Sequence, residues 1–222
     1  MFAKNGTRGE EAEILLELKM IADVGLIGYP SVGKSSILSR ISSARPKIAD
    51  YHFTTLSPNL GVVSTHGEHG FVAADIPGLI EGAADGAGLG HAFLRHVDRC
   101  RLLLHVVDVA AVEYREPIED IKTINRELAR YSPELATRPQ IIVANKCDMV
   151  LYDEEPYCRD FENYVKELGC ELFYVSAVTG EGIDEMLRAV EKALRDLPPI
   201  KVYEREITPE EEAAEAAVGV RE

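Results

Sequence analysis

The stretch GYPSVGKSS, Gly28–Ser36, determines how the rest of this chain is interpreted. It comes directly after the apolar run DVGLI, Asp23–Ile27, and directly before ILSRISSA, Ile37–Ala44. The spacing G-x-x-x-x-G-K-[ST] between a strand and a helix is typical of a phosphate-binding loop. Glycine lets backbone N–H groups curl around phosphate oxygens, and the start of the helix contributes unpaired N–H groups and a partial positive charge. The stretch therefore predicts a nucleotide site.

Two side chains of this loop have expected tasks. We expect Lys34 to reach the outer phosphates and the hydroxyl of Ser35 to ligate Mg²⁺. The alternative is a plain strand-to-helix turn, in which glycine and serine are common, but the strand and helix on either side favour the phosphate loop. The residues assigned to the nucleotide here are Gly28, Pro30, Ser31, Val32, Gly33, Lys34, Ser35 and Ser36.

Composition limits the classes of function. The 222 residues suffice for one sizeable α/β domain, and 24 basic against 38 acidic residues give a net charge of −14, which argues against non-specific nucleic-acid binding. The four cysteines have no C-x-x-C spacing and indicate neither a disulfide framework nor a zinc site. The longest apolar run, 102–112, is interrupted by His105 and Asp108 and is too short to cross a bilayer. We expect a soluble, cytoplasmic protein without a membrane partner.

Apolar strands alternate with amphipathic helices along the chain. This pattern predicts an α/β fold of the P-loop NTPase type, with a mostly parallel six-stranded sheet, one antiparallel edge strand and helices on both faces. The antiparallel strand comes from a hairpin of 60–65 and 70–76. Residues 45–59 and the glycine-rich 78–90 are interpreted as loops. The predicted helices are 34–44, 92–99, 118–131, 161–168 and 183–197.

Ligands of open parallel sheets bind beyond the carboxyl ends of the strands, so the residues there are informative. One strand ends in DIPG, Asp75–Gly78. We expect Asp75 to hold Mg²⁺ through water, opposite Ser35, and the segment with Pro77 and Gly78 to meet the terminal phosphate. Taken alone, Asp75 could equally be an ordinary turn aspartate; together with the phosphate loop it indicates a metal site.

A second strand ends in NKCD, Asn145–Asp148. An aspartate there can accept two hydrogen bonds from N1–H and the exocyclic amine of guanine, which adenine does not offer in that geometry. The stem of Lys146 can lie over the base, and Asn145 would tie this loop to the phosphate loop. The sequence therefore predicts guanine rather than adenine.

The next strand ends in SAV, Ser176–Val178. We expect Ser176 and the amide of Ala177 to reach the guanine oxygen and to support Asp148, with Val178 beside them. Four loops in this order are far more specific than any one of them.

The ordered set GYPSVGKSS, FTTL, DIPG, NKCD and SAV resembles the GTP-binding domain of translation-factor-class GTPases. Within it, KIADYHFTTLSPNLGVV, Lys47–Val63, and DIPGLIEGAADGAGLGHAFLRH, Asp75–His96, resemble the Obg family of bacterial ribosome-assembly GTPases. The resemblance extends over residues 11 to 197. It implies a Mg²⁺-dependent GTPase of slow turnover that binds GTP, GDP and ppGpp and acts in maturation of the large ribosomal subunit.

The resemblance also assigns residues of the segment FTTL. By position, Thr55 closes onto Mg²⁺ and the γ-phosphate, with Thr54 as the alternative and Phe53 beside them. The implied metal set is Ser35, Thr55 and Asp75.

Family members carry a glycine-rich N-terminal domain and, in most cases, a small C-terminal one. We therefore expect an isolated, monomeric G domain at 11–200, a remnant or linker at 1–10 and an acidic tail at 201–222, with ribosome binding a property of the full-length protein.

Two positions depart from related GTPases. Leu79 follows D-x-x-G where many relatives have a glutamine that positions water, so no catalytic residue is assigned; Obg relatives share this replacement. Ser31 stands where some potassium-stimulated GTPases have asparagine. Because of Leu79, a nucleotide-sensing binding module with incidental hydrolysis stays an alternative. Asp148 argues against an ATPase or small-molecule kinase on the same loop, unless ATP competes with GTP in binding.

Overall fold

The computed structural model describes residues 22–44, 47–48, 59–64, 70–76, 100–150 and 156–198. Within them one sheet has the strand order β2-β3-β4-β1-β5-β6-β7. Its strands are β1 (Val24–Ile27), β2 (Lys47–Ile48), β3 (Asn59–Val63), β4 (Phe71–Asp75), β5 (Leu102–Asp108), β6 (Gln140–Asn145) and β7 (Glu171–Val175). The helices are α1 (Lys34–Ile41), α3 (Pro117–Tyr131), α4 (Pro133–Ala136), α5 (Pro156–Glu167) and α6 (Ile183–Asp196), with the 3₁₀ helix η2 at Cys147–Met149.

The strand directions confirm a mostly parallel sheet. β1 pairs in parallel with β4 and β5, and the parallel order continues through β6 to β7. β3 is antiparallel to β4, as the hairpin predicted. The sheet has a seventh strand, however, because β2 pairs with β3 inside the segment 45–59 that was predicted to be a loop, and so β3 lies one place in from the edge. A strand of two residues is too short to show the alternation of polar and apolar residues that predicts a strand, so the sequence pattern could not indicate it.

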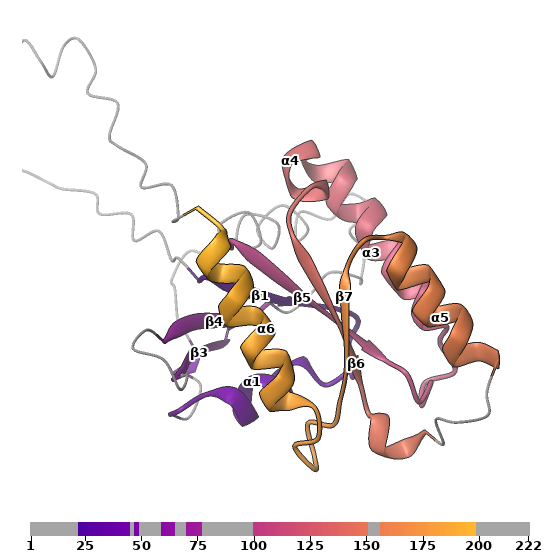
Figure 1. The fold of residues 1–222 in the computed structure, drawn as a ribbon, viewed down its shortest axis with the longest axis horizontal. Helices are drawn as coiled ribbons and strands as arrows, with labels where there is room; N and C mark the ends of the chain where they lie inside the picture. The colour runs from indigo at the N-terminus through magenta and orange to yellow at the C-terminus, as the bar shows by residue number, and fades with distance from the viewer. Residues whose placement is uncertain are drawn as a thin grey trace, which may run out of the picture.

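Helices cover both faces of the sheet, as predicted (Figure 1). Successive residues of a strand point to opposite faces, and a strand between two helical layers is therefore apolar throughout. The layer of α1 and α6 packs on the sheet through Ile37, Leu38, Ile41, Ile183, Met186 and Val190. The layer of α3 and α5 meets it through Ile121, Phe161 and Val165, which contact Val107, Ile142 and Ala144.

Helix boundaries differ from the predicted ones at both ends: α1 ends at Ile41 rather than at 44, and two helices begin earlier than predicted. α3 begins at Pro117 and α5 at Pro156, rather than at 118 and 161. Proline suits the first helical position because its fixed φ matches the helix and its missing N–H would have no partner there. The short α4 was not predicted, and the predicted helix 92–99 lies outside the described residues. Among the described helices none is long and apolar enough to cross a membrane.

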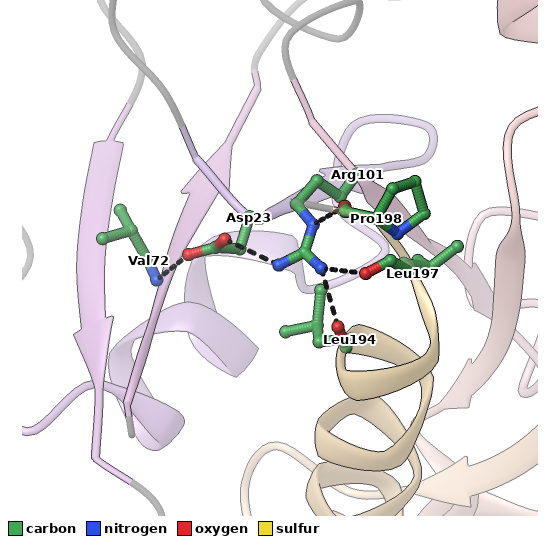
Figure 2. A network of polar contacts seen from close by, with 6 residues as sticks. All are labelled: Asp23, Val72, Arg101, Leu194, Leu197 and Pro198. Atoms are coloured by element: carbon green, nitrogen blue, oxygen red, sulfur yellow. Dashed lines mark hydrogen bonds and ion pairs between the residues drawn. The ribbon is translucent and has the colours of Figure 1, made fainter. Parts of the chain in front are cut away.

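Arg101 joins α6 to the start of the sheet (Figure 2). The phosphate loop follows the carboxyl end of β1, at the other end of the strands. The guanidinium of Arg101 donates to the main-chain oxygens of Leu194 at 2.7 Å, Leu197 at 2.6 Å and Pro198 at 2.8 Å. The last carbonyls of a helix have no partner inside the helix, so a charged donor there is stabilising. Arg101 therefore caps the C-terminus of α6.

The same guanidinium reaches the strand layer through Asp23. Its Nη1 lies 3.3 Å from Asp23 Oδ1, and Asp23 Oδ2 accepts from the backbone N–H of Val72 at 3.1 Å (Figure 2). Arg101 and Asp23 are respectively 18% and 25% exposed at their side chains, so water screens the pair only in part. One side chain thus connects α6 with the ends of β1 and β4.

We expect Arg101→Ala to lower the free energy of unfolding by about 2 to 3 kcal/mol, because a charged donor is lost from several acceptors at once. Arg195→Ala is the control, since Arg195 is 78% exposed and lies 3.8 Å from its partner Glu191. Its loss should change stability by less than about 0.5 kcal/mol. Urea unfolding followed by circular dichroism measures both variants. Equal losses would contradict the capping role.

Candidate nucleotide site

The phosphate loop connects β1 to α1 and requires glycine at two positions. Gly28 and Gly33 have φ of 147° and 99°, a region that residues with a side chain rarely adopt. A Cβ on Gly28 would also collide with the carbonyl oxygen of Val106, and one on Gly33 with the side chain of Asn145. The two motif glycines are therefore needed both for backbone conformation and for close contact with β5 and β6.

Lys34 follows the phosphate loop in sequence, and its side chain bonds back to that loop. Its ammonium donates to the carbonyl oxygens of Gly28 at 2.8 Å and Tyr29 at 2.9 Å. Burial lowers the pKa of Lys34, and the negative charge of Asp75 acts against that effect. A partly buried ammonium is suited to an anionic ligand, because water competes less with its charge than at the open surface.

Asp75, the last residue of β4, lies beside the first turn of α1. The hydroxyl of Ser35 donates to Asp75 Oδ2. Asp75 is 3% exposed, and its Oδ1 is buried without a hydrogen-bond partner among the described residues. A buried, unpaired carboxylate oxygen beside a hydroxyl fits a hard cation such as Mg²⁺, which prefers oxygen ligands. Within the part of the chain that the structure describes, no three His, Cys, Asp or Glu side chains cluster as a metal site.

Asn145 connects three loops through one buried amide. Its Nδ2 donates to the carbonyl oxygen of Val32 at 2.7 Å, and its Oδ1 accepts from the N–H of Ala177 at 3.1 Å. The residue is 2% exposed. The predicted link from Asn145 to the phosphate loop is therefore present, and a second link to the loop after β7 accompanies it.

Lys146 has an ion-pair partner that the sequence analysis missed. Its Nζ lies 2.7 Å from Asp108 Oδ2 at the end of β5, and Asp108 Oδ1 accepts from the N–H of Ala110 at 3.0 Å. Lys146 also has a φ of 69°. In the sequence, Asp108 stands out only as a break in an apolar run. The position of a carboxylate at the carboxyl end of a parallel strand was a usable signal, as it was for Asp75.

The loops for the base occupy the same edge of the sheet. Asp148 is exposed in η2, next to the buried Cys147. Ser176 is fully buried, and its Oγ accepts from the N–H of Thr179 at 3.0 Å. The N–H of Ala177, expected to face the guanine oxygen, donates to Asn145 in this structure. Val178 is 80% exposed.

A further link missed by the sequence analysis comes from α1. Arg40 donates to the carbonyl oxygens of Val178 at 3.1 Å and Thr179 at 2.8 Å, which holds the loop after β7 against the helix that follows the phosphate loop.

The remaining predicted site residues divide into two groups. Pro30, Ser31 and Ser36 lie at the exposed surface of the phosphate loop and α1. The other group, outside the described residues, comprises Phe53, Thr54, Thr55, Pro77 and Gly78, and Leu79, to which no role was assigned, lies outside them too.

Residues 23–146 match the model of a family described as 50S ribosome-binding GTPase. The chain belongs to this GTPase family. It is 57% identical over 212 residues to the GTPase Obg of Clostridium novyi and 53% identical over 211 residues to that of Alkaliphilus oremlandii. Each match covers 95% of this chain and 49% of the relative, so the chain spans about half the length of the curated relatives it matches. These relatives confirm the prediction of an Obg-type GTPase domain.

Solved structures confirm the P-loop GTPase fold of this family member. The G domain of the FeoB iron transporter of T. maritima superposes with a TM-score of 0.57 at 20% identity, covering 78% of this chain and 99% of that one. Aquifex aeolicus Era bound to GDP.AlF4⁻ gives 0.57 at 23% identity, covering 81% of this chain and 57% of Era. At such identities the likeness concerns architecture alone.

We expect Asn145→Asp to lower the free energy of unfolding by about 2 kcal/mol or more, because a carboxylate cannot donate to Val32 and a buried carbonyl loses its partner. Asn125→Asp is the matched control. Asn125 Oδ1 only accepts, from Gln140 Nε2 at 3.0 Å, and a carboxylate keeps that bond. The control should lose less than about 1 kcal/mol. Thermal and urea unfolding of the nucleotide-free protein measure the difference, and equal losses would argue against the donor role of Asn145.

Proposed function

We propose that this chain binds GTP and GDP with Mg²⁺ and hydrolyses GTP slowly, as a two-state switch. The observation that supports it best is the Asn145 amide, which joins the phosphate loop, the NKCD loop and the loop after β7. The two loops that would hold the base are thereby fixed relative to the loop that would hold the phosphates. A nucleotide needs both ends held at a set distance, and such preorganisation raises affinity.

Each end of this site has residues suited to its part of the ligand. At the phosphate end, the N-terminus of α1 and the partly buried ammonium of Lys34 offer positive charge to the β- and γ-phosphates. At the base end, Asp148 accepts the two guanine donors, and the pair with Asp108 holds Lys146 so that its stem is available as a platform. An acceptor that a bound base would cover rejects a base without matching donors, because the acceptor would then lose its bonds to water without replacement.

Ser35 and Asp75 would hold Mg²⁺, with Thr55 as the third member of the proposed set. When bound, the ion would neutralise charge that develops on the phosphates during transfer. Ser35 already lies at hydrogen-bond contact with Asp75, so the two oxygens are together before any ion arrives. No side chain is assigned to positioning the attacking water.

The wider role is proposed from the relatives, since their names concern proteins about twice as long. We place this chain in a cytoplasmic protein of large-subunit maturation that also responds to ppGpp. The family description, 50S ribosome-binding GTPase, and the name GTPase Obg support that placement. In this proposal residues 11–200 act as a monomeric G domain, flanked by a domain remnant or linker at 1–10 and an acidic tail at 201–222.

Calorimetric titration of the chain with GTP, GDP, ppGpp and ATP tests binding, and single-turnover assays with Mg²⁺ test hydrolysis. We expect guanine nucleotides to bind, ATP to bind at least 100-fold more weakly, and hydrolysis on the order of 10⁻³ s⁻¹ or slower, as in unstimulated small GTPases. Equal affinity for ATP would contradict the guanine assignment. Binding without hydrolysis, with or without large ribosomal subunits, would favour a nucleotide-sensing module instead.

Asp148→Asn should weaken GTP binding by at least 100-fold and allow xanthosine triphosphate to bind, because the amide presents a donor where the carboxylate accepted. Asp160→Asn, an exposed aspartate of α5, is the control and should leave both affinities unchanged. Calorimetry with the two nucleotides measures the switch. Undiminished GTP affinity in Asp148→Asn would remove Asp148 from the base site.

Ser35→Ala should reduce Mg²⁺-supported GTP affinity at least tenfold while changing GDP affinity in EDTA by less than threefold, because only the ion contact depends on the hydroxyl. Ser39→Ala, an exposed serine of the same helix, is the control. A fluorescent nucleotide titrated with and without Mg²⁺ gives the four affinities. An equal loss in EDTA would mean that Ser35 acts on phosphate or on the loop rather than through the ion.

A further inference from the structure

The phosphate loop contains one aromatic residue, Tyr29, whose side chain points away from solvent. Tyr29 is 8% exposed. The guanidinium carbon of Arg115 lies 3.2 Å from the centre of its ring. Arg115 comes from the segment between β5 and α3, far from the loop in sequence. A guanidinium stacked on an aromatic ring is attracted to it, most strongly where water is excluded.

Arg115 is itself held from the other side. Its Nε lies 3.2 Å from Asp120 Oδ2 and its Nη2 lies 2.9 Å from Asp120 Oδ1. Asp120 is 7% exposed and sits in the first turn of α3, where a negative charge is favoured by the helix dipole. Two parallel bonds fix the plane of the guanidinium as well as its position, which a single contact would not do.

The main chain of Tyr29 touches the group that would meet the phosphates. Its carbonyl oxygen accepts from Lys34 Nζ at 2.9 Å. Four groups therefore form a continuous series: the carboxylate of Asp120, the guanidinium of Arg115, Tyr29, and the ammonium of Lys34. The ring and the carbonyl belong to one residue, so holding the ring restricts the carbonyl that orients Lys34.

We propose that Arg115 is a positioning residue for the nucleotide phosphates, which clamps Tyr29 and thereby keeps the phosphate loop and Lys34 in their binding arrangement. The inference rests on the proposed function, because it assumes that phosphates bind here. Arg115 does not touch the nucleotide in this proposal. Arg115 slows the dissociation of a bound nucleotide in this proposal, because a phosphate loop that opens more often releases its ligand sooner.

α3 supplies a matched control for this arrangement. Lys122 pairs with Glu119 at 2.8 Å and lies 5.6 Å from the ring centre of Tyr164. Like Arg115, Lys122 is a cation that contacts both a carboxylate and an aromatic ring. The ring that it contacts, that of Tyr164, belongs to α5 and not to the phosphate loop. The Lys122–Glu119 pair is more exposed, at 44% and 63%, and its ring contact is longer, so the melting temperatures show how much of any effect is general destabilisation. Of the two cations, only Arg115 contacts the phosphate loop.

The test measures dissociation of a fluorescent GDP analogue from wild type, Arg115→Gln, Tyr29→Leu, the double variant and Lys122→Gln, together with the melting temperature of each nucleotide-free protein. We expect Arg115→Gln and Tyr29→Leu each to speed dissociation at least fivefold, and the double variant to be no more than twofold faster than the quicker single one, because both remove the same contact. Lys122→Gln should change the rate by less than twofold. Arg115→Lys should lie between wild type and Arg115→Gln, because it keeps the charge without the planar fork.

Three results would overturn the inference. One is an unchanged rate in Arg115→Gln while wild type binds GDP, which leaves the proposed function intact. Another is multiplication of the two single effects in the double variant. The third is an equal rate increase in Lys122→Gln at an equal fall in melting temperature, which would mean general destabilisation. If Arg115→Gln did not fold, Arg115→Lys and Asp120→Asn would carry the comparison. Absence of GDP binding by wild type would instead remove the proposed function itself.

Discussion

The geometry of the candidate site depends on one buried side-chain amide, that of Asn145. A buried amide must find both a donor and an acceptor partner, because an unmet polar group in the interior costs free energy. Asn145 satisfies this requirement by bonding to Val32 in one loop and to Ala177 in another. Parallel strands make the arrangement possible, since their carboxyl ends all meet at one edge. The loops after β1, β6 and β7 consequently form a single unit.

At the opposite end of the strands, too, a few side chains connect several elements. There Arg101 bonds to the last carbonyls of α6 and to Asp23 (Figure 2). A charged group thus stabilises the end of the sheet that lies opposite the candidate site. The two ends therefore differ in kind. At one, the guanidinium of Arg101 donates to Asp23 and to three carbonyl oxygens. At the other, Lys34 is partly buried and donates to two carbonyl oxygens, and Oδ1 of Asp75 is buried without a hydrogen-bond partner among the described residues, so both groups keep bonding capacity for a ligand.

Charge at the candidate site is arranged locally, against a net charge of −14 for the whole chain. Arg115 lies beside Asp120, and Lys146 beside Asp108, so each of these two cations has an anion that fixes its direction. Such pairs near a surface add little stability by themselves, but they restrict a long side chain to one orientation. That restriction, rather than overall attraction, is what a small anionic ligand requires from an acidic protein.

The order of motifs along the chain was enough to determine the fold class, the phosphate loop, the carboxylate of Asp75 and the NKCD loop, because glycine spacing and strand ends are local properties. Those local rules could not reveal β2, whose two residues form a strand only by pairing with β3. Nor could they reveal that Lys146 turns to Asp108 or that Arg115 stacks on Tyr29, since each pair joins segments distant in sequence. The sequence by itself determined which chemical groups reach the ligand edge of the sheet. Tertiary structure decided how they are aimed, because the direction of a side chain depends on partners brought beside it only when the sheet and its helices pack.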